Sequence, residues 1–409
     1  GLGDVYKRQD PRGASDKSGR TFNNPYQYFF EQMHMDDAIY ADESIYEYPM
    51  QQGGGNDGRP YSFGRPSSGG SKAAYPCKSY GQGRINPAYF YGVFDPNDMR
   101  RDVSITMTGS NGKGVEKLIP FVPNSKAEGG GLTLNKWDEN RQANPWVAAQ
   151  RKSGINGPYM RMSEVYLGYA EVCAALGDVV TGKQYLKTVR ERSFPQGLAN
   201  TDAFIASFGN DLVRAIIEER GFEYAGEGDR RWTLIRSGYL PEDIKRIKDM
   251  TKAMMDGLAT KGYYEFENGN IISAYIWTKL VDAKTIYGHR LTAQCPTDKV
   301  NDPVLYPGWR GQKDNWEEMG LNYGSSTPAT NLAIKGLFEI VSEEEAASLE
   351  SQGYTKVNWG IDLVDNRDEY DKYLFWDYDY VSAPIYLWPF TPNVMAAGGF
   401  TNGYGFKQE

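Results

Sequence analysis

PYMRMSEVYLGYAEVCAALGD, Pro158–Asp178, is the segment that decides the fold class of this chain. Its apolar side chains recur at helical spacing. We therefore expect a helix with one buried face, formed by Met162, Val165, Tyr166, Tyr169, Cys173 and Leu176. Gly177 and Asp178 follow the last apolar position, which is typical of the end of a helix.

Three further short helices are expected directly after this one. Thr181 suits the N-cap of a second helix, TGKQYLKTVRERSF, which ends before Pro195. A third helix is expected to place Phe208, Leu212 and Ile216 on one line. It runs into the segment DLVRAIIEERGFEYAGEGDRRWTLIRSG, residues 211–238. A fourth surrounds Trp232–Arg236. Short helices with tight connections predict two packed helical hairpins.

The rest of the chain carries weaker patterns. Pro241–Leu258 is amphipathic and predicts a helix, and Glu343–Glu350 predicts a short one. Brief strands are expected at Glu43–Tyr48 and Tyr354–Trp359, and a hairpin is expected to join Val103–Thr108 to Val115–Val122. Gln51–Asp102 and Gly262–Tyr323 are expected to be long, irregular and aromatic. The predicted fold class is mainly α, with irregular loops and a few short strands.

Three sequence landmarks resemble one known family. Arg161–Glu171 matches R-x-A/S-E-V-Y-L-x-x-A-E, and Glu219–Arg236 matches E-R-x-x-E-x-x-G-E-G-x-R-x-x-x-L-I-R. Tyr386–Phe390, YLWPF, matches a terminal Y-L-W-P-x. Their order resembles that of the SusD/RagB family of Bacteroidetes outer-membrane nutrient-binding lipoproteins, over roughly Asn24–Phe406.

The resemblance implies a SusD-like helical scaffold with tetratricopeptide-like helix pairs. It implies a single domain over residues 21–409, with a helical core at about 158–258 and aromatic loops before and after it. Residues 1–20 are expected to be flexible or non-native, because GLGDVYKRQ resembles translated adapter sequence. The family's signal peptide and lipobox cysteine are not seen in this sequence, so a truncated N-terminus is expected.

Composition excludes several classes of function. The 409 residues carry a net charge of −8 with both signs interspersed, which argues against nucleic acid or an anionic membrane surface as a partner. No apolar run approaches the ~20 residues that a membrane span requires. Three cysteines and two histidines give no metal framework, and Asp95–Asp102 lacks the glycine and glutamate of a calcium loop. No metal and no cofactor are expected.

Aromatic side chains give the main signal for function. The chain has 30 Tyr, 9 Trp and 17 Phe, many in segments expected to be loops. Flat, half-polar rings can cover the C–H faces of sugars. From the family's placement of ligand-contacting aromatics, we expect ligand binding by Tyr61, Tyr75, Tyr80 and Trp137, with Trp309 and Trp316 as a second set. The alternative for each ring is packing beneath its own loop.

Carboxylates between positions 218 and 229 raise the alternative of a glycan-active enzyme. Arginines interleave with these acids, and paired charges keep carboxylates ionised, whereas a general acid needs a raised pKa. We therefore interpret Glu219, Arg220, Glu227 and Arg230 as a structural salt-bridge set, and no catalytic residue is expected.

The resemblance then implies a function. It implies a cell-surface protein that captures oligosaccharides and hands them to a SusC-like TonB-dependent transporter at the extracellular face of the outer membrane. Attachment to the membrane would be only through an N-terminal lipid absent from this chain. Peptide capture, as in the RagB branch, remains the alternative within the same architecture.

Overall fold

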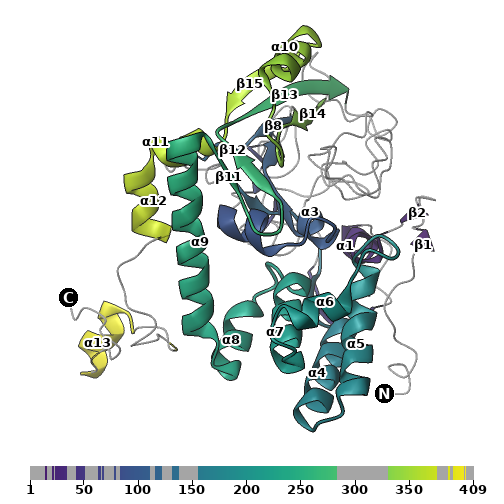
Figure 1. The fold of residues 1–409 in the computed structure, drawn as a ribbon. Coiled ribbons are helices and arrows are strands. Elements are labelled where there is room, and N and C mark those ends of the chain that lie inside the picture. The colour runs from purple at the N-terminus through teal and green to yellow at the C-terminus, as the bar shows by residue number, and fades with distance from the viewer. Residues whose placement is uncertain are drawn as a thin grey trace.

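The chain is described by a computed structural model. The residues that it describes are 14–15, 21–22, 24–34, 43–50, 63–65, 67–68, 78–79, 83–110, 116–121, 131–137, 155–282, 330–374, 386, 390–399 and 401. Over these residues the protein is mainly helical with short strands, which confirms the predicted fold class (Figure 1). None of the helices among them is long and apolar enough to cross a membrane.

The helical block expected around residues 158–258 is present. It contains α4 (Met162–Ala175), α5 (Val179–Arg192), α6 (Thr201–Ala206), α7 (Leu212–Glu223) and α8 (Arg230–Ser237). Helices α4 and α5 form an antiparallel pair beside α7 (Figure 1).

Two local expectations in this block are wrong. The N-cap of α5 is Asp178, whose carboxylate accepts a hydrogen bond from the backbone N–H of Thr181 at 3.1 Å. The helix therefore begins at Val179, and Thr181 lies inside it. Phe208 lies in the turn between α6 and α7, because Asp211 caps α7 and starts that helix at Leu212.

The buried face of α4 also differs from the expected one. Its buried apolar residues are Met162, Leu167, Ala170 and Cys173. Val165, Tyr169 and Leu176, which were expected to be buried, are exposed. The helix packs on α5 and α7 through one face, and on the other apolar face the Tyr169 ring packs edge-on against Tyr185 of α5, with 4.9 Å between the ring centroids.

Helix α9 (Leu240–Lys261) is the longest helix of the described residues and runs from α8 to the strands that follow it in the chain (Figure 1). Pro241 lies in its first turn, and Gly262 ends it in the left-handed conformation with φ of 76°. The strands β11 (Tyr263–Glu265), β12 (Ile271–Ser273) and β13 (Tyr275–Asp282) follow. The expectation that the chain is irregular from Gly262 onward is therefore wrong for these strands.

Strand β13 is the centre of a three-stranded antiparallel sheet. It pairs with β14 (Thr330–Lys335) and with β15 (Thr355–Asn358), in the order β14-β13-β15. Helices α10 (Glu343–Ser351) and α11 (Gly360–Asp365) flank β15 along the chain, and α12 (Arg367–Leu374) and α13 (Pro392–Gly398) follow.

The N-terminal part supplies the other short elements of the described residues. These are β1 (Ala14–Ser15), β2 (Thr21–Phe22), α1 (Pro25–His34), β3 (Ser44–Tyr48), β4 (Ser67–Ser68), β5 (Lys78–Ser79), the π-helix η2 (Tyr89–Val93), α3 (Arg100–Ser104), β6 (Ile105–Thr106), β7 (Thr108–Ser110), β8 (Glu116–Leu118), β9 (Thr133–Leu134) and β10 (Gly157–Arg161). Strand β7 pairs with β8 antiparallel, with Thr108 opposite Leu118, so the expected pairing is present at Thr108. The rest of the expected first strand differs, because Val103 and Ser104 are helical and β6 pairs with β9.

Candidate ligand-binding surface

A cluster of exposed tyrosines lies on the small antiparallel sheet formed by β3 and β10. At the end of β3 the side chains alternate, so Tyr46 and Tyr48 point to solvent while Glu47 between them is buried. Tyr159 of β10 is 74% exposed, and its ring lies edge-on to that of Tyr46, with 5.6 Å between the ring centroids. We call Tyr46, Tyr48 and Tyr159 the tyrosine surface.

A β-bulge directs the third ring to this surface. Pro158 pairs with Glu47 and Met160 pairs with Tyr46, so Tyr159 between them has no partner in the register. Bulges of this kind re-aim a side chain and are common beside functional sites. Gly157 lies opposite Tyr48 and brings no side chain against its ring. The three rings therefore form an open, half-polar platform; since Tyr46 and Tyr159 meet at 85°, a sugar or another flat group would stack on the face of one ring and contact the edge of the other.

Beneath this platform the same two strands carry buried charges. Glu43 directly precedes β3, and Arg161 ends β10; both side chains are at most 1% exposed and contact each other at 3.3 Å. They belong to a cluster in which five basic side chains face five carboxylates. Its members are Lys136, Arg100, Arg161, Arg190 and Arg192, with Glu43, Asp98, Glu219, Glu223 and Glu227. We call it the buried ion cluster.

Helix α7 places the central acids of this cluster. Glu219 and Glu223 lie one turn apart, and Arg100 contacts them at 2.6 and 3.1 Å. Arg161 and Arg192 both reach the carboxylate of Glu223, and Arg192 also forms a two-point pair with Glu43. Helix α7 is thereby joined to α3, α5 and the β3–β10 sheet, which gives the tyrosine surface a rigid support.

The electrostatics of the cluster keep its acids ionised. Burial alone would raise the pKa of Glu223, but Arg192, Arg161 and Arg100 outweigh it and hold that pKa well below its usual range. In the same way Arg161 and Lys136 lower the pKa of Glu227 against the effect of burial. A general acid for glycoside hydrolysis needs the opposite shift. These two residues are unsuited to that role.

All four residues of the expected salt-bridge set take part in ion pairs. Glu219 pairs with Arg100 and Arg190, and Glu227 pairs with Arg161 and Lys136. Arg220 pairs with Glu164 and Asp229, and Arg230 pairs with Glu218 and Asp243. Most of these partners lie far away in the sequence, on α4, α3, α5 and α9, and not within the interleaved 218–236 segment.

Trp137 is not available to a ligand. Its side chain is 1% exposed and packs in an apolar cluster with Tyr26, Phe29, Phe30 and Leu134, among others. The expectation that this ring contacts a ligand is therefore wrong, and its role is that of a core residue. The other expected ligand-binding residues, Tyr61, Tyr75, Tyr80, Trp309 and Trp316, lie outside the described residues.

Sequence reasoning missed the tyrosine surface, although part of its signal was present. The alternation in IYEY, residues 45–48, predicts a strand with Tyr46 and Tyr48 on one face. Residue 47, between the two tyrosines, is a charged Glu, which by polarity alone would be placed on the exposed face. In the structure Glu47 is buried and the tyrosines are exposed, so polarity does not show which face is buried. Tyr159 depends on a bulge that no local pattern announces.

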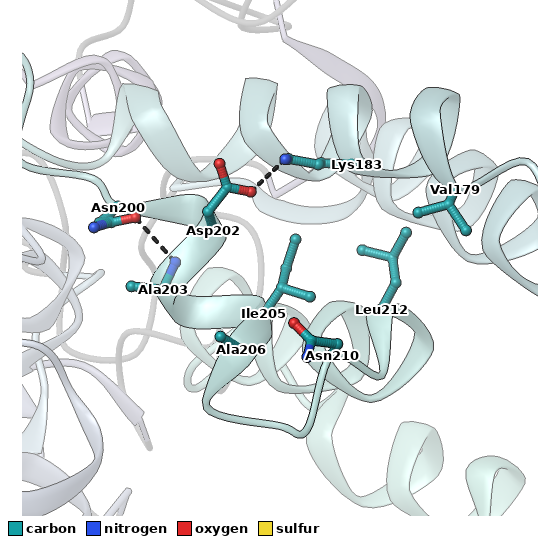
Figure 2. Close-up of a pocket in the computed structure, with 9 residues that line it drawn as sticks. All are labelled: Val179, Lys183, Asn200, Asp202, Ala203, Ile205, Ala206, Asn210 and Leu212. Atoms are coloured by element: carbon teal, nitrogen blue, oxygen red, sulfur yellow. Dashed lines mark hydrogen bonds and ion pairs between the residues drawn. The ribbon is translucent and has the colours of Figure 1, made fainter.

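A concave feature lies among α5, α6 and α7 and shares no residue with the tyrosine surface. It is a pocket of about 570 Å³, lined by Val179, Lys183, Asn200, Asp202, Ala203, Ile205, Ala206, Asn210 and Leu212. Figure 2 shows Val179, Ile205 and Leu212 pointing into it, with Lys183 and Asp202 paired across one side. The floor is aliphatic and contains no aromatic ring, which distinguishes it from the tyrosine surface.

Metal ligands do not gather in the part of the chain that the structure describes, where no three His, Cys, Asp or Glu side chains form a group able to hold an ion. The oxygen-rich segment at residues 95–102 is used internally. Asp95 accepts a hydrogen bond from the backbone N–H of Asn97 at 2.8 Å, and Asp98 pairs with Arg100 at 2.7 Å.

Comparison with known proteins identifies relatives. The sequence model of the SusD family matches residues 5–389, which is nearly the whole chain. SusD-like protein P25 of Formosa agariphila is 28% identical over 160 residues, covering 39% of this chain and 26% of that protein. The chain therefore spans about a quarter of the length of the curated relative that it matches.

Solved structures similar to this chain share less of its sequence. A SusD homolog from Bacteroides thetaiotaomicron is 19% identical, with a TM-score of 0.36, covering 57% of this chain and 49% of that one. Surface glycan-binding protein A from the same organism, in complex with laminarihexaose, is 18% identical with a TM-score of 0.35, covering 52% and 46%.

Proposed function

Because this chain belongs to the SusD family, we propose that it is a cell-surface glycan-binding protein that captures oligosaccharides without altering them. The observation that carries the proposal is the tyrosine surface, where three exposed rings stand on a sheet held by the buried ion cluster. Rigid rings lose little conformational entropy on binding, so a sugar can stack on them at low cost.

The proposal extends to partners and location. A SusC-like TonB-dependent transporter would receive the captured oligosaccharide at the extracellular face of the outer membrane, with the binding protein attached by an N-terminal lipid. The family resemblance in the landmarks at 161–171, 219–236 and 386–390 supports this. The predicted ligand residues Tyr61, Tyr75, Tyr80, Trp309 and Trp316 remain part of the proposal as additional contacts.

Binding rather than turnover is also part of the proposal. The acids that would tempt an assignment as a glycosidase are engaged by arginines, and Glu219 and Glu223 are fully buried. A substrate cannot reach them from the tyrosine surface without opening the buried ion cluster.

The first test measures affinity by isothermal titration calorimetry against oligosaccharides of defined linkage. Tyr159→Ala removes the most exposed ring of the tyrosine surface and should weaken binding roughly 5- to 150-fold, the equivalent of ~1–3 kcal/mol for one stacked ring. The melting temperature should not change, because the ring is 74% exposed.

Tyr169→Ala is the matched control, because this tyrosine is 49% exposed but lies on α4. It should bind every oligosaccharide with wild-type affinity. Equal losses in both variants would separate the glycan site from the tyrosine surface. Binding to peptides alone would replace oligosaccharide capture by the alternative of peptide capture, and newly formed reducing ends would overturn the binding-only function.

A further inference from the structure

A small polar pocket lies at the end of α5, where the chain turns toward α6. Its volume is about 470 Å³, and it is lined by Glu191, Arg192, Gln196, Gly197 and Ala199. This volume is within the usual range for a small-molecule site. The larger side chains in this lining are polar, in contrast to the aliphatic floor of the pocket among α5, α6 and α7. We call this site the polar pocket.

A tight turn forms the outer side of the polar pocket. The backbone N–H of Leu198 donates to the carbonyl of Pro195 at 3.0 Å, and Gly197 has φ of 82°. Such a turn requires glycine at its third position. A Cβ atom at Gly197 would meet no atom within 4 Å, and Gln196 beside it is exposed. The turn therefore leaves the pocket open to solvent and holds the Gln196 amide at its rim.

Arg192 supplies a hydrogen-bond donor that no described residue uses. Its side chain is 7% exposed, both terminal nitrogens bond to Glu43, and Nη2 also donates to Glu223 at 2.5 Å. The Nε–H is buried and has no hydrogen-bond partner among the described residues. A buried donor without a partner is unfavourable, so an acceptor oxygen on a ligand would gain a bond there.

The chemistry of the polar pocket favours a neutral ligand rich in hydroxyls. Arg192 is already paired with two carboxylates, and Glu191 lies 3.4 Å from Lys187. A sulfate or carboxylate would therefore find no unpaired cation in this lining and would meet the exposed Glu191 carboxylate. The Arg192 Nε–H, the Gln196 amide and the Glu191 carboxylate together offer donors and acceptors. Hydroxyl groups, which both donate and accept, match such a mixed set.

One ion pair joins the polar pocket to the tyrosine surface. Arg192 of the pocket pairs with Glu43. Glu43 directly precedes β3, whose Tyr46 lies three residues farther along, about 10 Å at the rise of a strand. The two sites therefore stand on one rigid support, and an oligosaccharide of several units can contact both.

We propose that the polar pocket is a second subsite for the captured oligosaccharide. It holds one neutral, hydroxyl-rich sugar unit of a chain whose other units stack on the tyrosine surface. The inference rests on the proposed function, because it takes the ligand to be an oligosaccharide. Stacking alone accepts many sugars, whereas hydrogen bonds to hydroxyls select among them. The polar pocket is thus the place where neutral units are preferred to acidic ones.

Isothermal titration calorimetry on the full chain tests this subsite. The probes are neutral hexasaccharides of defined linkage and their uronate-bearing counterparts. Gln196→Ala should weaken binding of a neutral hexasaccharide about 2- to 12-fold, as expected for the loss of one hydrogen bond. Ala199→Leu, which narrows the pocket, should weaken it at least as much. Gln196→Ala should keep the wild-type melting temperature, because Gln196 is exposed.

Two further variants sharpen the test. Gln184→Ala is the matched control, because it removes an exposed glutamine of α5 that does not line the pocket, and it should bind with wild-type affinity. In the wild type the neutral hexasaccharide should bind more tightly than its uronate-bearing counterpart. Glu191→Gln keeps the shape of the side chain but removes its charge, so this difference should shrink.

The outcomes separate this inference from the proposed function. If Gln196→Ala and Ala199→Leu bind like the wild type while Tyr159→Ala binds more weakly, the polar pocket is not a subsite and the proposed function stands. If only the pocket variants lose affinity, the polar pocket is the glycan site and the tyrosine surface is not. Tighter binding of uronate-bearing chains would refute the preference for neutral units. A wild-type protein that binds no hexasaccharide would overturn both proposals.

Discussion

Two regions of this protein are equally buried but are held by different forces. Around α7, five basic side chains face five carboxylates in the buried ion cluster. Between α9 and the β14-β13-β15 sheet, the core is apolar and rich in aromatic rings such as Phe338 and Trp359. There the Trp359 indole N–H donates to the Tyr91 hydroxyl at 2.8 Å, and the Phe121 and Trp359 ring centroids lie 4.1 Å apart.

The difference teaches how each region can be damaged. An apolar core loses stability in proportion to the volume removed, at any pH. An ion cluster depends on balance, because removing one charge leaves its partners buried and uncompensated. The cluster gains specificity from this, since α7, α3, α5 and the β3–β10 sheet fit together only when each charge meets its partner.

The largest expected effect comes from unbalancing the cluster. Glu223→Gln keeps the shape of the side chain but removes the carboxylate that Arg100, Arg161 and Arg192 share. The free energy of unfolding at pH 7, measured by urea titration, should fall by about 3–5 kcal/mol. Because the folded-state pKa of Glu223 is lowered, its contribution is complete above pH ~4.5 and is lost as the pH falls.

Ile276→Val in the apolar region is the matched control. Ile276 is fully buried, and the missing methylene should cost about 0.5–1.5 kcal/mol. This loss should be the same at pH 4 and pH 7, whereas the Glu223→Gln loss should shrink at the lower pH. Parallel pH profiles for the two variants would show that the ion cluster and the apolar core respond to pH in the same way, which would contradict the difference between them.

Lys136 gives the second-largest expected effect, which is again a gain of stability with rising pH, but at alkaline pH. Burial lowers its pKa to about 8, although the Glu227 carboxylate at 2.6 Å opposes the shift. Between that value and ~10.4 the unfolded chain binds this proton and the folded protein does not, so stability should rise with pH. We expect the free energy of unfolding to increase by about 2–3 kcal/mol from pH 8 to pH 10. Above that range the raised pKa values of Tyr26 and Tyr224 act in the other direction.

Lys136→Met should flatten this rise, because a methionine of similar length leaves Glu227 paired with Arg161. The measurement is urea unfolding of both proteins at several pH values in that range. If the wild-type free energy of unfolding is constant between pH 8 and pH 10, Lys136 is solvated enough to keep its ordinary pKa.

Local sequence patterns predicted where helices begin and end better than they predicted which parts of the chain pack against them. Periodicity and end signals located α4, α8 and α9 closely, because a helix is specified by its own residues. They did not show which apolar face of α4 is covered, because that depends on α5 and α7. Val165, Tyr169 and Leu176 follow the spacing of a buried face but are exposed, so the pattern alone cannot show which apolar face packs in the core.

The buried ion cluster shows the same limit for charges. The acids at positions 219, 223 and 227 could be recognised as ion-paired from the arginines near them. The pairs that build the cluster, such as Glu223 with Arg161 and Glu43 with Arg192, join residues 62 and 149 positions apart. Trp137 is the matching case among the aromatics, since its burial depends on α1. These are tertiary facts that no local pattern contains.

The smallest expected effect lies at the edge of the charged region, at Arg220. Its guanidinium contacts Glu164 at 2.8 Å and Asp229 at 2.6 Å, but those side chains are 36% and 21% exposed. The substitution Arg220→Ala removes the cation that both acids share. Because water reaches both acids, the structure predicts a loss of about 1–2 kcal/mol.

Salt dependence separates Arg220 from the interior of the cluster. Raising the ionic strength from 0.1 to 1 M shortens the screening length from ~10 to ~3 Å, which should weaken partly exposed pairs more than buried ones. The cost of Arg220→Ala in urea unfolding should therefore diminish at high salt, while the cost of Glu223→Gln should persist. Arg220→Lys, which keeps the charge but loses the fork of donors, should fall between wild type and Arg220→Ala. A salt-independent loss at Arg220 as large as that at Glu223 would move the boundary of the buried ion cluster outward to α4.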